Sequence, residues 1–211
     1  QSVKVMPDRT TCGFGEVSRF KLPASALIDF RTISIFADIT LYAGTLTGGS
    51  GYSLHLPRNT ASLIQQITIT CNGVQLCNIN DYNLLYNTLY DLEGADYSQG
   101  SKRLLENFDP SLYYYAGNAG TNAAVNVINA QDATNANNYE TNRPIVINNF
   151  LGFLGSLSTP VLDLDDTGDI YIDIRWAPTS VLWGATNTNL TATTTYTTTT
   201  GCTFNNLRMT C

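Results

Sequence analysis

Apolar residues recur at every second position in several stretches of the chain, which is the pattern of half-buried β-strands. The pattern is clearest over residues 27–42, 170–176 and 202–211. Ile145 and Ile147 indicate a further strand. In the first stretch, the expected inward positions are Ile33, Ile35, Ala37, Ile39 and Leu41.

An Asn-Gly pair at residues 72–73 predicts a tight β-hairpin over residues 62–79. A two-residue turn pairs Cys71 with Val74. Because side chains alternate between the two faces of a strand, this register places Cys71 and Cys77 on opposite faces. A disulfide between them is therefore not expected. The side chains expected to point inward are Ile67, Ile69, Val74 and Leu76.

Over residues 81–93 the apolar period changes from 2 to that of an α-helix. A second short helix is expected over residues 101–107, where Asp109-Pro110 would end it. The apolar face of the first helix is predicted to consist of Tyr82, Leu85, Tyr86 and Leu89.

These elements predict an all-β fold, a jelly-roll β-sandwich with two short inserted helices, because no alternation of strands and helices indicates a parallel sheet. Residues 1–25 are interpreted as an N-terminal arm or edge segment. Residues 26–201 form the jelly-roll domain, with a helical insertion at about 81–109. A strand near residues 124–128 is expected within a long excursion, and residues 202–211 are interpreted as the final strand.

Charged residues make up 13% of the sequence, and 17 acidic against 11 basic residues give a net charge of −6. Phosphate binding needs several Lys or Arg on one surface, so direct nucleic-acid binding is not expected. No apolar run is long enough to span a bilayer. Five cysteines form an odd set at low density, which favours reduced thiols and assembly inside a cell.

No constellation of residues predicts catalysis or a cofactor. His55 is the only histidine, and no nucleophile motif accompanies it, so a Ser-His-Asp or Cys-His group is not indicated. Cys71 and Cys77 have no second pair of ligands that could complete a zinc site. The chain is therefore not expected to be an enzyme.

A cluster of aspartates resembles the first half of a calcium-binding loop, but position 174, where a twelfth-position Glu is expected, is Ile. We favour a polar turn before the following strand. The same carboxylates could also serve glycoside hydrolysis, which is a weaker alternative. The calcium candidates are Asp163, Asp165 and Asp169, with Asp166 beside them.

Tyrosines are concentrated in and after the predicted helices, and tyrosine is enriched at protein interfaces. Two interpretations remain open: the rings contact another subunit, or they pack the helices onto the sandwich. The candidate interface residues are Tyr82, Tyr86, Tyr90, Tyr113, Tyr114 and Tyr115.

Three stretches resemble the double jelly-roll major capsid proteins of tailless double-stranded DNA viruses, of the virophage and polinton-like type. They are "PRNTASLIQQITITCNGVQLCNINDYNLLYNTLYDLEG" (57–94), "STPVLDLDDTGDIYIDIRWAP" (158–178) and "FNNLRMTC" (204–211), which are similar to parts of the N-terminal roll and to the lead into the second.

The resemblance implies a structural virion protein assembled inside the host cell. It implies homotrimeric, pseudo-hexameric capsomers in an icosahedral shell, in contact with neighbouring capsomers and other capsid proteins, with an internal viral membrane nearby. A complete double-roll chain is about twice as long, so a single-roll minor or penton capsid protein is an alternative.

A different class of protein is the main rival. A secreted carbohydrate-binding or adhesin β-sandwich would hold calcium at residues 163–169 and carry a glycan at Asn189.

Overall fold

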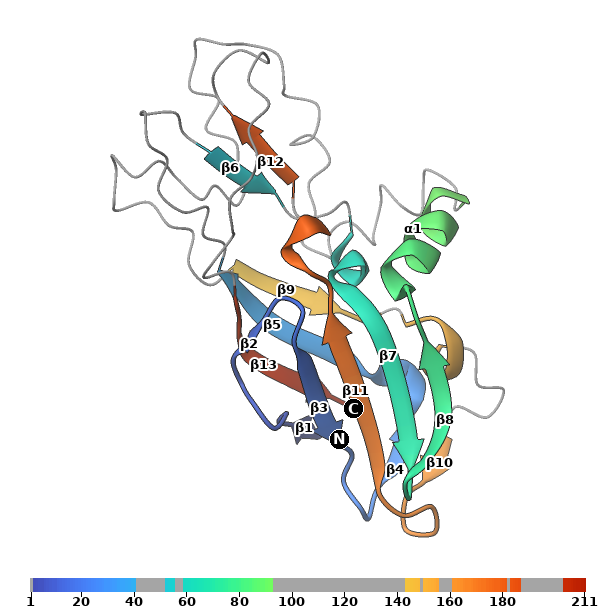
Figure 1. Cartoon of the computed structure of the whole chain (residues 1–211). Helices are drawn as coiled ribbons and strands as arrows, with labels where there is room; N and C mark the ends of the chain where they lie inside the picture. Colours follow the sequence, from blue (N-terminus) through green and yellow to red (C-terminus); the bar gives the residue numbers. More distant parts are fainter. Residues whose placement is uncertain are drawn as a thin grey trace.

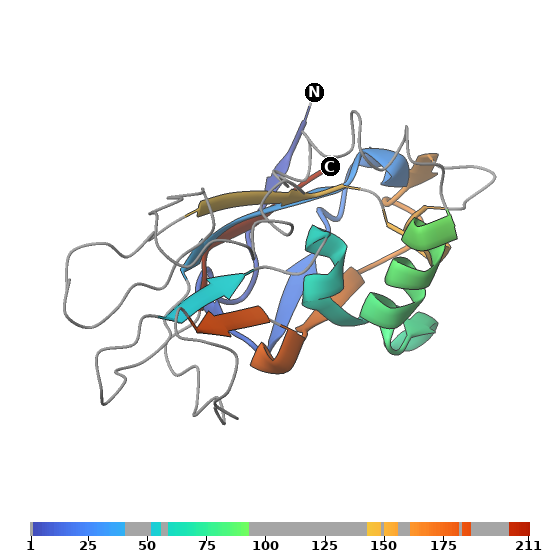
Figure 2. The same ribbon diagram turned by 90° about the horizontal axis from the view of Figure 1, so that it is seen from above.

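The computed structural model describes residues 2–40, 52–55, 59–92, 143–148, 150–155, 161–181, 183–186 and 203–211 (Figures 1 and 2). The expected helix at 101–107 and strand at 124–128 lie outside these ranges. The strands are β1 (Lys4–Val5), β2 (Cys12–Gly13), β3 (Val17–Lys21), β4 (Leu27–Asp29), β5 (Ser34–Thr40), β6 (Tyr52–His55), β7 (Ile64–Cys71), β8 (Val74–Ile79), β9 (Arg143–Ile147), β10 (Val161–Asp163), β11 (Ile170–Trp176), β12 (Trp183–Thr186) and β13 (Thr203–Thr210). The helical segments are α1 (Tyr82–Leu92) and the 3₁₀ turns η1 (Phe30–Thr32), η2 (Thr60–Leu63), η4 (Gly152–Leu154) and η5 (Thr179–Val181).

Two antiparallel sheets form the body of the molecule and face each other (Figure 2). One has the strand order β1-β13-β5-β9, with β2 also paired to β13. The other has the order β3-β11-β7-β8. Two small ribbons, β4 with β10 and β6 with β12, lie at opposite ends of the sandwich (Figure 1).

The pairing of the eight main strands is nested along the sequence. The first strand, β1, pairs with the last, β13; β3 pairs with β11, β5 with β9, and β7 with β8. This is a long antiparallel hairpin rolled into two sheets, which defines a jelly roll. The predicted fold class is therefore confirmed.

Aromatic side chains from both sheets meet in the core. Trp176 of β11 stacks on Phe204 of β13, with ring centroids 4.2 Å apart, and Phe14 lies 4.7 Å from the same ring. The indole N–H of Trp176 donates to the buried hydroxyl of Ser18 at 2.9 Å. The one polar atom of the Trp176 side chain is thus satisfied inside the core.

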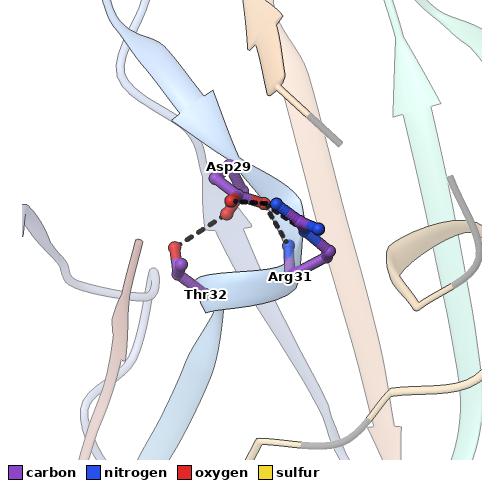
Figure 3. Close-up of polar contacts among 3 residues, drawn as sticks. All are labelled: Asp29, Arg31 and Thr32. Atoms are coloured by element: carbon purple, nitrogen blue, oxygen red, sulfur yellow. Dashed lines mark hydrogen bonds and ion pairs between the residues drawn. The ribbon is translucent and has the colours of Figure 1, made fainter. Parts of the chain in front are cut away.

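The strand predicted over residues 27–42 is divided in two. Ile33, Ile35, Ala37 and Ile39 are buried as expected, but η1 separates β4 from β5. The 3₁₀ turn is closed by Asp29, whose carboxylate accepts the Arg31 N–H at 3.0 Å and also pairs with its guanidinium (Figure 3). The Thr32 hydroxyl donates to the Asp29 carbonyl at 2.7 Å. These local bonds compete with the strand ladder.

The β7–β8 hairpin forms at the predicted turn, with Asn72 and Gly73 at φ values of 49° and 79°. Its predicted register holds only next to the turn. A bulge then shifts the pairing, so Ile69 lies opposite Cys77 instead of Leu76. The predicted opposite facing of Cys71 and Cys77 is therefore wrong, and both thiols pack against the core as free cysteines. Val74 and Leu76, expected inward, are exposed.

The segment interpreted as an arm or edge contributes strands to both sheets. β1 and β3 are outer strands, and β3 lies along β11 over five residue pairs. Residues 4–21 therefore belong to the sandwich edge instead of extending away as an arm. The predicted final strand is present as β13, where Asn206 at φ 50° marks the irregularity that lets Phe204 and Leu207 both face inward.

Three long connections begin and end at one end of the sandwich. They comprise residues 41–63, 80–142 and 177–202. The antiparallel register requires this placement, because Thr40 lies opposite Thr203 and Ile64 lies opposite Trp176. The opposite end carries the tight turn between β7 and β8 (Figure 1). The two ends of the molecule are thus built differently.

Candidate functional site

Helix α1 is fixed to the sandwich by two of its predicted interface tyrosines. Tyr82 and Tyr86 are 0% and 3% exposed, and their ring centroids lie 6.0 Å apart in the core. The Tyr82 hydroxyl accepts the backbone N–H of Leu151 at 2.9 Å. Both rings therefore pack the helix onto the sandwich, which was the second of the two interpretations, and neither presents a surface to a partner.

A polar junction holds the next turn of the same helix. The side-chain amide of Asn59 donates to the side-chain oxygen of Asn87 at 2.7 Å, and the Ser62 hydroxyl lies 2.8 Å from the same oxygen. Asn59 also caps η2, since its side chain accepts the Ser62 N–H at 2.8 Å. Asn59 and Ser62 are buried, so this satisfied network fixes α1 against η2.

The outer side of α1 is apolar and exposed. Its predicted apolar face is therefore only half correct, because Leu85 and Leu89 point away from the core that holds the two tyrosines. The helix carries more leucine than its packing uses. Its exposed large apolar residues are Leu84, Leu85, Leu89 and Leu92.

Strand β8 also exposes apolar side chains. Val74 and Leu76 are 64% and 47% exposed, and β8 is one of the two outer strands of its sheet. No charged residue occurs between positions 59 and 80. In both views β8 and α1 lie on the same side of the sandwich (Figures 1 and 2).

The other edge of the same sheet is charged and internally paired. Arg19 of β3 donates two hydrogen bonds to Asp173 of β11, at 2.7 and 2.6 Å. Lys21 pairs with Asp169 at 2.8 Å. The hydrogen bonds to these carboxylates raise the pKa of both basic side chains. The basic groups on this edge are thus already neutralised by neighbours.

The calcium candidates do not converge. The carboxylate of Asp163 accepts the backbone N–H of Asp165 at 3.1 Å, as in a polar turn, and Asp169 is held by Lys21. Among the residues that the structure describes, no three His, Cys, Asp or Glu side chains are placed to hold a metal ion. The arrangement is the polar turn favoured above.

The remaining candidate residues are scattered. His55 lies in β6, opposite Trp183 of β12. Cys12 is buried, which raises the pKa of its thiol, and Cys202 lies outside the described residues. Tyr90 belongs to α1, but its side chain is not among those described. Tyr113, Tyr114 and Tyr115 also lie outside, so their interface role stays a prediction.

No helix within the described ranges is long and apolar enough to cross a membrane.

Comparison with known proteins bears on the fold. No protein-family model and no curated protein sequence matches the chain significantly. The whole chain superposes on a subunit of the PBCV-1 virus capsid, known from a quasi-atomic model, with a TM-score of 0.51 and 12% identity. PBCV-1 VP54, fitted into a reconstruction of the virophage Sputnik, gives a TM-score of 0.49 at 13% identity. This chain spans 41% of each of those chains, and the likeness to the PBCV-1 capsid subunit concerns the jelly-roll fold.

Proposed function

We propose that the chain is a structural subunit of a viral capsid and has no catalytic role. The observation that carries this proposal is the nested eight-strand topology with three long connections at one end. A shell needs a rigid wall element that can stand side by side with copies of itself. The sandwich supplies the wall, and the end with the long connections is available to form an outer surface.

In the finer form of the proposal, three copies form a trimeric capsomer of an icosahedral shell. Residues 202–211 then lead into a second jelly roll, which makes the capsomer pseudo-hexameric. The chain spans 41% of the PBCV-1 capsid subunit that it resembles, which is close to the share of one roll in a chain of two. The virophage or polinton-like type, assembly inside the host cell, and a nearby internal viral membrane belong to this same proposal.

The electrostatics support a shell role that leaves the genome to other proteins. The net charge is −6, and Arg19 and Lys21 on the charged edge are each paired with a carboxylate. Nucleic-acid binding requires basic groups that are free to replace counterions along the phosphates. No observation on the described residues favours the rival carbohydrate-binding protein, since its calcium ligands do not converge.

Light scattering on the purified chain tests the proposal. We expect a species with three times the mass of one chain, or larger closed assemblies, at micromolar concentration. A single chain of 23.0 kDa at every concentration would contradict the proposal.

A further inference from the structure

We propose that Asn72 is a deamidation site whose reaction the fold holds back. It reacts in chains whose β7–β8 turn has come away from the loop that precedes β11. Deamidation converts the Asn72 side chain to a carboxylate, with water as the co-reactant. The proposal goes beyond the capsid role and does not depend on it, because it concerns the covalent chemistry of one turn.

The sequence supplies the reacting atoms, since Asn72-Gly73 is its one Asn-Gly pair. The backbone nitrogen of Gly73 attacks Cγ of Asn72. A bond forms between these atoms, the bond from Cγ to Nδ2 breaks, and ammonia leaves with the proton of the Gly73 nitrogen. Because glycine has no Cβ, no side chain shields its nitrogen. Water then opens the resulting succinimide ring, at Cγ to give aspartate or at the backbone carbonyl carbon to give isoaspartate.

The fold opposes the first step by holding the Asn72 side chain on another loop. Both residues of the turn are exposed, so water reaches them and burial gives no protection. Instead, Nδ2 donates to the Thr167 carbonyl and Oδ1 accepts the Asp169 N–H, each at 3.1 Å. The backbone N–H of Asn72 donates to the Asp169 carbonyl, also at 3.1 Å. Ring closure expels Nδ2 and turns Cγ onto the Gly73 nitrogen, so both side-chain bonds must break first.

The loop that receives the side chain is shaped to hold it. Gly168 lies between the two bonding partners with a φ of 79°, and a Cβ there would overlap the Asn72 side chain. The Cys71 thiol donates to the same Thr167 carbonyl at 3.0 Å, which ties the hairpin to this loop a second time. The Asn72 side chain thus occupies a space that only a glycine at position 168 leaves open, and the reactive arrangement is a locally opened state.

The product no longer fits the junction. In aspartate an oxygen replaces Nδ2, so two acceptors face each other where the amide donated to the Thr167 carbonyl. The new negative charge lies beside a loop that already carries Asp165 and Asp166. Isoaspartate adds a carbon atom to the backbone of a turn whose geometry sets the register of the hairpin. A chain that has reacted therefore does not close this junction again.

Substitution of Gly168 tests the proposal without changing the Asn-Gly pair. Gly168→Ala places a Cβ in the space of the Asn72 side chain and so displaces it. The control is Gly15→Ala, because Gly15 has a φ of 80° and nothing lies within 4 Å of its added Cβ. Both variants carry similar backbone strain, and only one releases Asn72. Circular dichroism checks that both are folded.

Peptide mapping by mass spectrometry follows the conversion of residue 72 during incubation at neutral pH. Wild type in guanidinium chloride gives the rate of a released Asn-Gly pair. We expect folded wild type and Gly15→Ala to react at least about tenfold more slowly than this, because the opened state is a minor population. Folded Gly168→Ala should react several times faster than Gly15→Ala.

Equal rates in the two glycine variants would overturn the proposal. Equal rates in folded and denatured wild type would overturn it as well, and that comparison does not depend on the folding of any variant. Neither result bears on the capsid role, which the mass of the assembly tests separately.

Discussion

The side chain of Asn72 lies against Gly168 and joins two loops at the end of the sandwich that carries the tight β7–β8 turn. Its amide donates to the Thr167 carbonyl at 3.1 Å, and its side-chain oxygen accepts the Asp169 N–H at 3.1 Å. Gly168 has a φ of 79°, and a Cβ at that position would overlap the Asn72 side chain. The turn signal of the hairpin thus also positions the loop that begins β11.

The two roles of Asn72 can be separated by substitution. Asn72→Gly keeps the left-handed backbone and removes only the side-chain bonds, which should cost about 1 kcal/mol of unfolding free energy. Asn72→Ala also loses the tolerance for positive φ, so it should cost about 1 kcal/mol more. Chemical denaturation measures both values. Equal stability of the alanine variant and the wild type would show that the junction contributes nothing.

The buried bond between Trp176 and Ser18 should be visible in a double-mutant cycle. Ser18→Ala leaves the indole N–H without an acceptor in the core and should cost about 1–3 kcal/mol. Trp176→Phe removes the donor, so Ser18→Ala in that background should cost clearly less. If the two substitutions are additive in denaturation experiments, the bond is not a determinant of stability.

Stability should fall in acid partly through Glu16. Its carboxylate accepts the Gly13 N–H at 2.9 Å, and this bond lowers the pKa of Glu16. Because the pKa of Glu16 is lower in the folded than in the unfolded state, its ionised carboxylate stabilises the fold at pH values above the unfolded-state pKa of about 4.3. This stabilisation is lost as the pH falls through the folded-state pKa. The stability difference between wild type and Glu16→Gln should therefore shrink below about pH 4. A difference that stays constant from pH 7 to pH 3 would contradict this.

Calcium should leave the melting temperature unchanged. Asp163 and Asp169 are engaged by Asp165 and Lys21, respectively. A bound ion at 100 times its dissociation constant would add about 2.7 kcal/mol of stability, a shift of several degrees. Thermal melting in millimolar calcium, with magnesium as the control, measures this shift. A calcium-specific increase would move the carbohydrate-binding hypothesis to first place.

Much of the fold could be predicted because the core strands are periodic. Ile170, Ile172 and Ile174 alternate with polar residues, and the structure buries all three. β3 was not recognised, because its inward positions are Ser18 and Phe20 while Val17 faces solvent. Ser18 faces inward, where its hydroxyl accepts the Trp176 N–H. The two residues are 158 positions apart, so the local hydrophobic pattern around Ser18 gives no sign of this contact.

The candidate site was harder to predict than the fold. The helix at residues 81–93 was expected, but its apolar residues exceed one face, and only tertiary contacts decide which are buried. Tyr82 and Tyr86 are the residues that are buried, and the Tyr82 hydroxyl accepts the Leu151 N–H in the core. Leu76 is the extra residue of a bulge in β8, which the turn sequence does not specify, whereas Val74 keeps its predicted pairing with Cys71 and is exposed as well. The absence of charge from residue 59 to residue 80 is the signal in the sequence that could have indicated the exposed apolar residues of β8.

Deletion of the region 81–109 is a poor test of assembly, because Tyr82 and Tyr86 belong to the core and their loss would destabilise the sandwich itself. The capsid proposal is tested most directly by electron microscopy of the purified native assembly. Two-dimensional averages should show particles with threefold symmetry, or closed shells built from them. Uniform particles of the size of one sandwich, without symmetry at any concentration, would contradict the proposal.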